Sequence, residues 1–362
     1  MKQKAKLLFS VILFIPMVLW AQERSNAKLY ETACASCHGL DGKGKAEADV
    51  AFDIPLPDFS DCEFASREPD PDWFAIAHQG GKVRAFDRMM PAFGEALTEE
   101  EILKILTHIR TFCEDNRWPR GEFNLPRPLF TEKAFPEDEA VLTTDYGSGD
   151  TKTVELEFLY EKRFGPAGMV EVAIPLKTMN PSVGDRASGV GDIAVGYKHT
   201  LLHNLESGNI FSAGAEIILP TGDENKGLGS GTTIFEPFIT FGKLLQADMF
   251  FQAHAFAEFP MKSGFDNEIG LRIAAGKSWT SGGPFGRAWS PMLEFLSVRD
   301  LKQGATTKLD LVPQIQISVN TRQHILFNVG LRVPVTETGS RDAHFVAYLL
   351  WDWFDGGFFD GW

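Results

Sequence analysis

The sequence predicts a small all-α domain followed by an all-β antiparallel barrel, and three observations support this fold class. The first third of the chain contains a Cys-x-x-Cys-His motif and a capped amphipathic helix. From about residue 141 to the end, apolar residues recur with a period of two. The alternating segments are about 10 to 13 residues long, whereas strands of soluble sandwiches are usually near 5 or 6. Segments of this length suit the tilted strands of an outer-membrane barrel, here with about 12 strands.

The first 21 residues are expected to be a secretory signal peptide. Three lysines precede an apolar run over residues 7–20, which is too short to span a bilayer, and Ala21 is small enough for cleavage. Removal of this segment leaves 32 basic against 49 acidic residues, so the net charge falls from −14 to −17. A chain this acidic is not expected to bind nucleic acid.

The stretch from Cys34 to His38, Cys-Ala-Ser-Cys-His, has the spacing of a c-type haem attachment site. Cys34 and Cys37 would form thioethers with the haem vinyl groups, and His38 would reach the iron from one face as the proximal ligand. A structural zinc site or a redox Cys-x-x-Cys needs a second ligand pair or a thioredoxin-like context, which the sequence lacks. We therefore predict one covalent haem c, attached outside the cytoplasmic membrane.

The second axial ligand is expected in the segment Met89-Met90-Pro91. Pro91 biases Met90 toward extended backbone, so that its thioether can project from a loop toward the iron. Met90 is thus the predicted ligand, with Met89 as the alternative. His78 and His108 are the other residues that could reach iron, and we interpret both as surface or helix-capping residues. With both axial positions filled, an electron carrier is expected rather than an enzyme.

A helix is predicted from Thr98 to Arg110, because Thr98 and Glu101 form a capping box and apolar residues follow at helical spacing. Another helix is expected from about residue 25 to 35. Over residues 25 to 113 the chain resembles the class I cytochrome c family, which implies one-electron transfer by a haem with His and Met ligands and a raised potential. The matching segments are Tyr30-Glu31-Thr32-Ala33, Gly39-Leu40-Asp41-Gly42-Lys43-Gly44, Pro57-Asp58-Phe59, Met90-Pro91-Ala92-Phe93 and residues 98–110.

Cys62 and Cys113 remain once the haem has used two of the four cysteines. In an oxidising periplasm they would most simply form a disulfide, and two buried free thiols are the alternative. Between the haem motif and the methionine loop, acidic residues suggest a docking site for a basic redox partner, with a solvated loop as an equal interpretation. They are Asp49, Asp53, Asp58, Asp61, Glu63, Glu68, Asp70 and Asp72.

Residues 114–140 are predicted to link the two domains, because they show no sustained helical or strand period. Trp118, Phe123, Leu125 and Phe130 make this segment too apolar for a free tether, so we expect part of it to pack against a neighbour.

Residues 141–362 form the predicted barrel, although a secreted soluble β-sandwich would also alternate. Asp192, Glu216 and Glu236 are expected to lie in strands and face the lumen. The last strand is expected to end near Phe354, before a terminal Trp362 of the kind found in outer-membrane barrels. Alternation is clearest over residues 153–158, 170–174, 193–197, 211–219, 309–319 and 325–333. Aromatic residues near predicted strand ends resemble an interfacial girdle: Phe235, Phe238, Phe250, Phe251, Trp279, Trp289 and residues 351–354.

Several segments over about residues 150 to 354 resemble the outer-membrane transporter-like barrels associated with phenol-degradation pathways. They are residues 189–198, Leu219-Pro220-Thr221-Gly222-Asp223, residues 226–231 and Glu236-Pro237-Phe238. This resemblance implies an outer-membrane location but no particular cargo.

The predicted organisation is a signal peptide (1–21), a cytochrome c domain in the periplasm (22–113), a linker (114–140) and an outer-membrane barrel (141–362). The leading hypothesis is a one-electron carrier anchored by its barrel in outer-membrane lipid. Because the hydrocarbon core is about 30 Å thick, one periplasmic haem cannot carry electrons across it. Periplasmic redox donors and acceptors are therefore expected partners. The alternative is a porin or transporter whose activity is coupled to the cytochrome domain.

Overall fold

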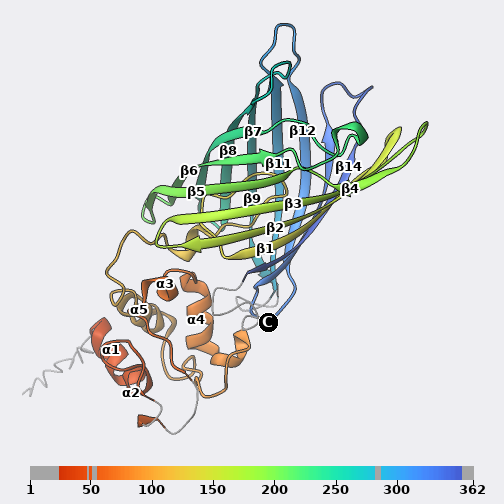
Figure 1. Cartoon of the computed structure of the whole chain (residues 1–362). Coiled ribbons are helices and arrows are strands. Elements are labelled where there is room, and N and C mark those ends of the chain that lie inside the picture. The colour runs from red at the N-terminus through yellow and green to blue at the C-terminus, as the bar shows by residue number, and fades with distance from the viewer. Residues whose placement is uncertain (1–23, 47–48, 51–54, 282–286, 353–362) are drawn as a thin grey trace, which may run out of the picture.

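A computed structural model describes residues 24–46, 49–50, 55–281 and 287–352, and it consists of a helical domain at one end of a β-barrel (Figure 1). The expected signal peptide, Asp53, Phe354 and the terminal Trp362 lie outside these ranges.

The helical domain is built from short helices around one apolar core. The predicted capping box is present, because the Thr98 hydroxyl accepts from the Glu101 N–H while the Glu101 carboxylate accepts from the Thr98 N–H. The core brings together side chains from both ends of the domain, including Tyr30, Trp73 and Leu106. The helices are α1 (Asn26–Ala33), α2 (Ala35–His38), α3 (Cys62–Ala65), α4 (Asp70–Gln79), η2 (Gly81–Arg84) and α5 (Glu99–Ile109).

A disulfide joins Cys62 at the start of α3 to Cys113 beyond the end of α5, closing a loop with a sequence separation of 51. It ties the segment after the haem motif to the end of the domain, as the sequence suggested. Within the described ranges, no helix has the length and apolar character needed to cross a membrane.

The second domain is a closed antiparallel barrel of 12 strands. Each strand pairs with the next along the chain, and β1 closes the barrel by pairing with β14. Short strands β4 (Ala187–Val190) and β10 (Trp279–Ser281) extend the pairing at the two ends. The barrel strands are β1 (Glu139–Gly147), β2 (Thr151–Phe164), β3 (Gly168–Pro181), β5 (Ile193–Asn204), β6 (Asn209–Leu219), β7 (Ile234–Leu244), β8 (Met249–Pro260), β9 (Glu268–Lys277), β11 (Arg287–Asp300), β12 (Lys308–Ser318), β13 (Ile325–Pro334) and β14 (His344–Asp352).

The barrel has polar residues inside and apolar residues outside. On β12, Asp310, Gln314 and Gln316 are buried, whereas Leu311 between them points outward and is 38% exposed. On β11, Glu294 is fully buried while the preceding Leu293 is 52% exposed. A soluble sandwich would show the opposite arrangement, so closure and burial together exclude that alternative.

Residues 121–138, which we call the plug, run through the lumen. This segment begins with η3 (Gly121–Phe123), where Phe123 packs against Phe135 and against Ile210 of β6. Farther along, Leu125 packs against Phe250 of β8. Most of the segment predicted as a linker is therefore part of the barrel interior, and β1 begins at Glu139 directly after it.

Three expected barrel positions differ from the sequence interpretation. Asp192 lies between β4 and β5, outside any strand, where its carboxylate accepts N–H bonds from Gly222 (2.9 Å) and Ser230 (2.6 Å) and holds the β6–β7 loop. Phe238 and Phe250 are 4% and 3% exposed and face inward, so they do not belong to an aromatic girdle. Phe235 and Trp279 do point outward, with 38% and 46% exposure.

Candidate haem site and plugged lumen

A largely apolar cavity of about 670 Å³ lies in the helical domain, and Cys34, Cys37 and His38 line it. Its size is typical of cofactor pockets, about 300–1,000 Å³. Opposite walls come from other elements of the core, including Phe59, Trp73 and Leu106. Two thiols, one imidazole and an apolar enclosure are the groups that a covalent haem requires, so the residues present fit this cofactor.

Local structure holds the motif in place. The His38 N–H donates to the Cys34 carbonyl (3.0 Å), and the His38 ring stacks on Phe59 with centroids 5.0 Å apart. Burial lowers the pKa of His38 to about 4, so the imidazole is neutral at pH 7 and suited to bind a metal. Its Nδ1 is buried and has no hydrogen-bond partner among the described residues. Burial also raises the pKa of the Cys34 thiol to about 11.

The methionine loop reaches the same cavity. Met90 and Met89 both line it, and Met89 is 45% exposed. The loop is fixed against the end of α4, because the Gly81 N–H donates to the Met90 carbonyl (3.1 Å). Glycine is required at position 80, because its φ is +81° and an added Cβ would lie 3.0 Å from the Met90 carbonyl oxygen.

His78 and His108, the other histidines that the sequence offered as iron ligands, are not among the described residues that line the cavity. His108 packs between the rings of Tyr30 and Phe112, with centroids 5.2 and 5.1 Å away. His78 stacks on Phe74 at 5.5 Å. Both lie in the last turn of a helix and pack against aromatic rings, and that neither binds iron stays a prediction.

The barrel completes the cavity wall, a contribution that the sequence did not reveal. Arg322 and His324, from the turn between β12 and β13, line the cavity beside residues of the helical domain. His324 Nε2 lies 3.0 Å from Glu68 Oε1, and the Arg322 guanidinium lies 4.5 Å from the centre of the Phe86 ring. A short turn with no recognisable motif gives no sequence signal for such a contact.

Four members of the expected acidic docking site have partners within the protein, and the first is Glu63, which pairs with Arg67 at 2.6 Å. Glu68 contacts His324 of the barrel, and Asp72 pairs with Arg84 at 2.8 Å. Asp70 pairs with Arg110 and Arg120, each at 2.8 Å. An acidic surface for a redox partner would therefore have to come from the remaining residues of that group.

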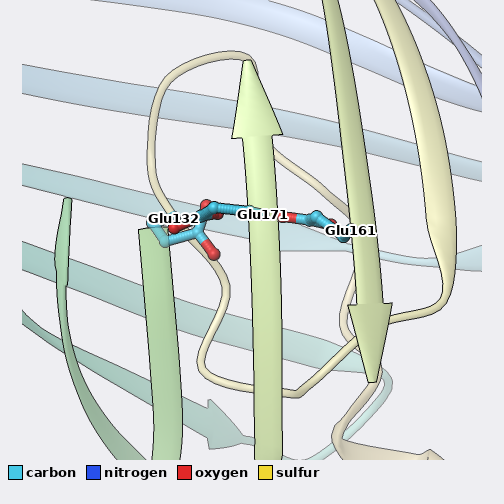
Figure 2. Close-up of side chains that lie close together, drawn as sticks. All are labelled: Glu132, Glu161 and Glu171. Carbon is cyan, nitrogen blue, oxygen red and sulfur yellow. The ribbon is translucent and has the colours of Figure 1, made fainter. Parts of the chain in front are cut away.

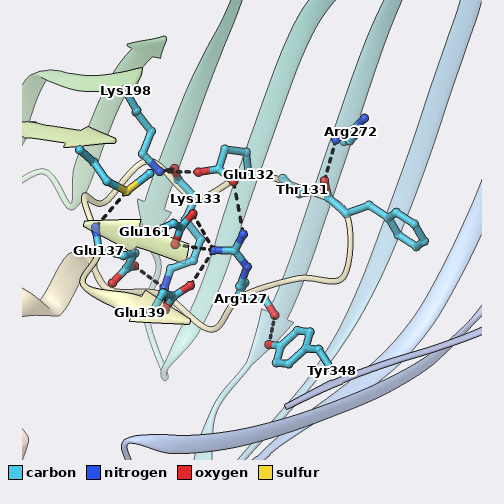
Figure 3. A network of polar contacts seen from close by, with 12 residues as sticks. Arg127, Thr131, Glu132, Lys133, Glu137, Glu139, Glu161, Lys198, Arg272 and Tyr348 are labelled. Carbon is cyan, nitrogen blue, oxygen red and sulfur yellow. Dashed lines mark hydrogen bonds and ion pairs between the residues drawn. The ribbon is translucent and has the colours of Figure 1, made fainter. Parts of the chain in front are cut away.

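The plug is held by buried charges near its centre (Figure 3). Arg127 contacts Glu139 of β1 at 2.6 Å and Glu161 of β2 at 3.0 Å. On the other side, Lys198 of β5 pairs with Glu132 and donates to the Lys133 carbonyl (2.7 Å). Pairing of this kind is needed because an isolated charge in a water-poor interior is costly.

Hydrogen bonds tie the plug to strands all around the lumen. Gln252 of β8 donates to the Pro126 carbonyl (2.8 Å), and Arg272 of β9 donates to the Phe130 carbonyl (2.9 Å). Ser212 of β6 donates to the Ala134 carbonyl (2.5 Å), and on the opposite side of the barrel Tyr348 of β14 donates to the Arg127 carbonyl (2.6 Å). Contacts on several sides of the wall show that the plug crosses the lumen at this level.

Glu132, Glu161 and Glu171 bring carboxylate oxygens within 4.8 Å of one another, an arrangement that could hold a cation (Figure 2). Lys198 already neutralises Glu132, and Arg127 already neutralises Glu161. We therefore assign Glu132 and Glu161 to the plug network and propose no metal for this group.

Comparison with known families identifies the class of the helical domain. Residues 21–109 match the family model described as cytochrome C oxidase, cbb3-type, subunit III. The match covers the haem motif, the methionine loop and the capped helix, so this domain is a cytochrome c domain.

Three solved structures are similar to the barrel. The NanC porin has 9% identity and a TM-score of 0.43, with 59% of this chain and 99% of the porin covered. An outer membrane channel from Pseudomonas putida F1 has 13% identity and a TM-score of 0.47, with 63% and 100% covered. For the KdgM porin the values are 9%, 0.40, 59% and 99%. A search of curated proteins gave no match.

Proposed function

We propose that this protein is a c-type cytochrome that transfers single electrons in the periplasm and is anchored in the outer membrane by a plugged barrel. The observation that carries the proposal is the cavity that brings Cys34, Cys37, His38 and Met90 together. When bound there, haem supplies a one-electron couple. Cys34 and Cys37 would hold it covalently, and His38 and Met90 would bind its iron from the two faces.

Placement in a membrane is supported by the outward face of the barrel. Its strands are 9 to 14 residues long, enough to cross a bilayer at a tilt. Leucine, isoleucine, valine and phenylalanine point outward around the wall, whereas lumen-facing positions are polar. An exposed apolar belt of this extent would drive aggregation in water, and lipid is the solvent that suits it.

A periplasmic position for the cytochrome domain is supported by the asymmetry of the connections. Bacterial barrels have short periplasmic turns and longer extracellular loops. The first residue of β1, Glu139, pairs with the last of β14, Asp352, and the Asp352 N–H donates to the carbonyl of His324, which contacts Glu68 of the helical domain. The first and last strands therefore start and end where the helical domain docks (Figure 1). Connections at that end include residues 165–167, 205–208 and 245–248, whereas the opposite end has residues 220–233 and 335–343.

The plug favours an anchor over an open channel. A channel needs a continuous aqueous path, but the plug is bonded to β6 and β8 on one side of the lumen and to β11 and β14 on the other. The polar wall nevertheless supports a second candidate, a channel that conducts when the plug leaves. Conductance of the purified protein in planar bilayers separates the two, since an anchor stays closed in both redox states of the haem.

The decisive experiment is a haem-stained gel of isolated outer membranes, run with boiled and unboiled samples. We expect one haem-positive band whose mobility changes on boiling. The matched control, Cys34→Ala with Cys37→Ala, should lose the stain and keep the mobility change. A haem-positive protein in the soluble fraction would overturn the membrane anchor, and a wild-type band without haem would overturn the cytochrome.

A further inference from the structure

The cavity of the cytochrome domain is closed by two side chains from the barrel. Arg322 and His324 belong to the β12–β13 turn, more than two hundred residues from the haem motif in sequence. Arg322 is fixed against the helical domain, because its guanidinium stacks on Phe86 and donates to the Ala85 carbonyl (3.4 Å). Helical domain and barrel therefore share one site.

The charged residues of the cavity include two pairs that lie next to residues of the barrel turn. Arg84 pairs with Asp72 at 2.8 Å and directly precedes Ala85, which Arg322 contacts. Glu68 lies four residues before Asp72 and contacts His324 at 3.0 Å. Cys34 and Cys37 lie instead at α1 and α2, which Figure 1 shows on the side of the domain away from the barrel.

The cavity thus has charged residues toward the barrel and cysteines away from it, and the edge of a haem is divided in a matching way. Its vinyl groups are on one part of the ring edge and its two propionates are on the part across from them. With the vinyl groups fixed to Cys34 and Cys37, the propionates extend toward the other end of the cavity. Carboxylates buried in an apolar cavity need charged or hydrogen-bonding partners, and a guanidinium is the best geometric match.

We propose that the haem propionates face the barrel and that Arg322 binds them, so that the barrel turn sets the reduction potential of the haem. This inference rests on the proposed function, because it requires a haem in the cavity. A cation beside the haem favours the reduced form, which carries one more negative charge than the oxidised form. Arg322 therefore raises the reduction potential. The haem of a cytochrome domain docked on this barrel has a higher potential than it would have without the β12–β13 turn.

The test is a redox titration of the full-length protein in detergent, followed by its visible absorption. Arg322→Ala and Arg322→Gln should each lower the ratio of reduced to oxidised haem about tenfold at the wild-type midpoint, which is about 59 mV for a one-electron couple. Arg322→Lys, which keeps the charge, should restore most of the ratio. Lys243→Ala is the matched control, because Lys243 is a cation near the same end of the barrel that binds the Ser207 carbonyl (2.8 Å).

A haem spectrum recorded on each variant shows whether haem is present, and so distinguishes failure of this inference from failure of the proposed function. Haem-containing Arg322 variants with the wild-type potential would overturn the inference and leave the cytochrome intact. A shift of equal size in Lys243→Ala would also overturn it, because a general loss of charge would then explain the result. Absence of haem in the wild-type protein would instead overturn the proposed function.

Discussion

Replacement of Glu294 by glutamine is expected to release the plug. Glu294 of β11 is fully buried, and its carboxylate accepts the N–H groups of three consecutive plug residues: Leu129 (3.1 Å), Phe130 (3.2 Å) and Thr131 (2.7 Å). The Thr131 hydroxyl and the Gln314 amide donate to it as well, at 2.7 and 2.5 Å. This side chain is thus the main acceptor for the middle of the plug.

The loss of stability of the bound plug can be worked out from those hydrogen bonds. A hydrogen bond to a charged group contributes about 1.5–3 kcal/mol and a neutral one about 0.5–1.5 kcal/mol, so neutralising the acceptor weakens each of the three N–H bonds from the plug by about 1 kcal/mol. The glutamine amide also turns one oxygen into a donor that faces other donors. A destabilisation of at least about 3 kcal/mol raises the population of the released plug about a hundredfold.

Single-channel recording in planar bilayers measures this population as the fraction of time spent open. We expect rare or no openings for the wild type and about a hundredfold more for Glu294→Gln. Glu258→Gln is the control, since this β8 carboxylate shares the inward row of Gln252 and has no hydrogen bond with the plug that the described structure shows. The reasoning is refuted if Glu294→Gln stays as closed as the wild type while haem content and heat-modifiable mobility are normal.

Three further predictions concern the cytochrome domain. Met90→Ala should lower the haem potential and let ferrous haem bind carbon monoxide, whereas Met89→Ala, at a position that is 45% exposed, should do neither; the reverse result would make Met89 the ligand. Cys62→Ser should destabilise the domain by about 4 kcal/mol, from a loop with a separation of 51, and unchanged thermal unfolding followed at the Soret band would contradict this. Thr98→Ala should cost about 1 kcal/mol by removing the cap of α5. Thr107→Ala, in the last turn of the same helix, is its control, and equal losses in the two variants would mean that the cap has no special effect.

Much of the fold could be predicted from the sequence because local rules determine it. The Cys34–His38 motif is fixed by covalent chemistry, and the cap formed by Thr98 and Glu101 involves residues three apart. The barrel strands follow from a period of two, which does not depend on what lies on either face. Strand number and closure agree with the prediction of about 12 strands.

The contents of the lumen could not be predicted, because the partners of the plug are far away in sequence. Arg127 binds carboxylates on β1 and β2, and Thr131 binds Glu294, a separation of 163 residues. In the sequence these charges look the same as those of a solvated linker. The apolar residues of the segment were the one signal that it packs against something, and Phe123 and Leu125 do so.

The burial of Phe238 and Phe250 has a similar cause. Alternation places their side chains on one face of the sheet, but it cannot show whether that face meets lipid or a plug. Phe250 fills space against Leu125, so its position depends on a segment that the pattern of its own strand does not contain.

The position of the plug in the chain also constrains how the barrel is assembled. The plug precedes β1, and the barrel closes where β1 pairs with β14, the last strand. Arg127 lies inside this seam: its guanidinium binds Glu139 of β1, while its carbonyl accepts from Tyr348 of β14 (2.6 Å) and Asn328 of β13 (3.2 Å). Arg127 therefore contacts both strands of the seam, so closure of the wall and filling of the lumen depend on the same residue.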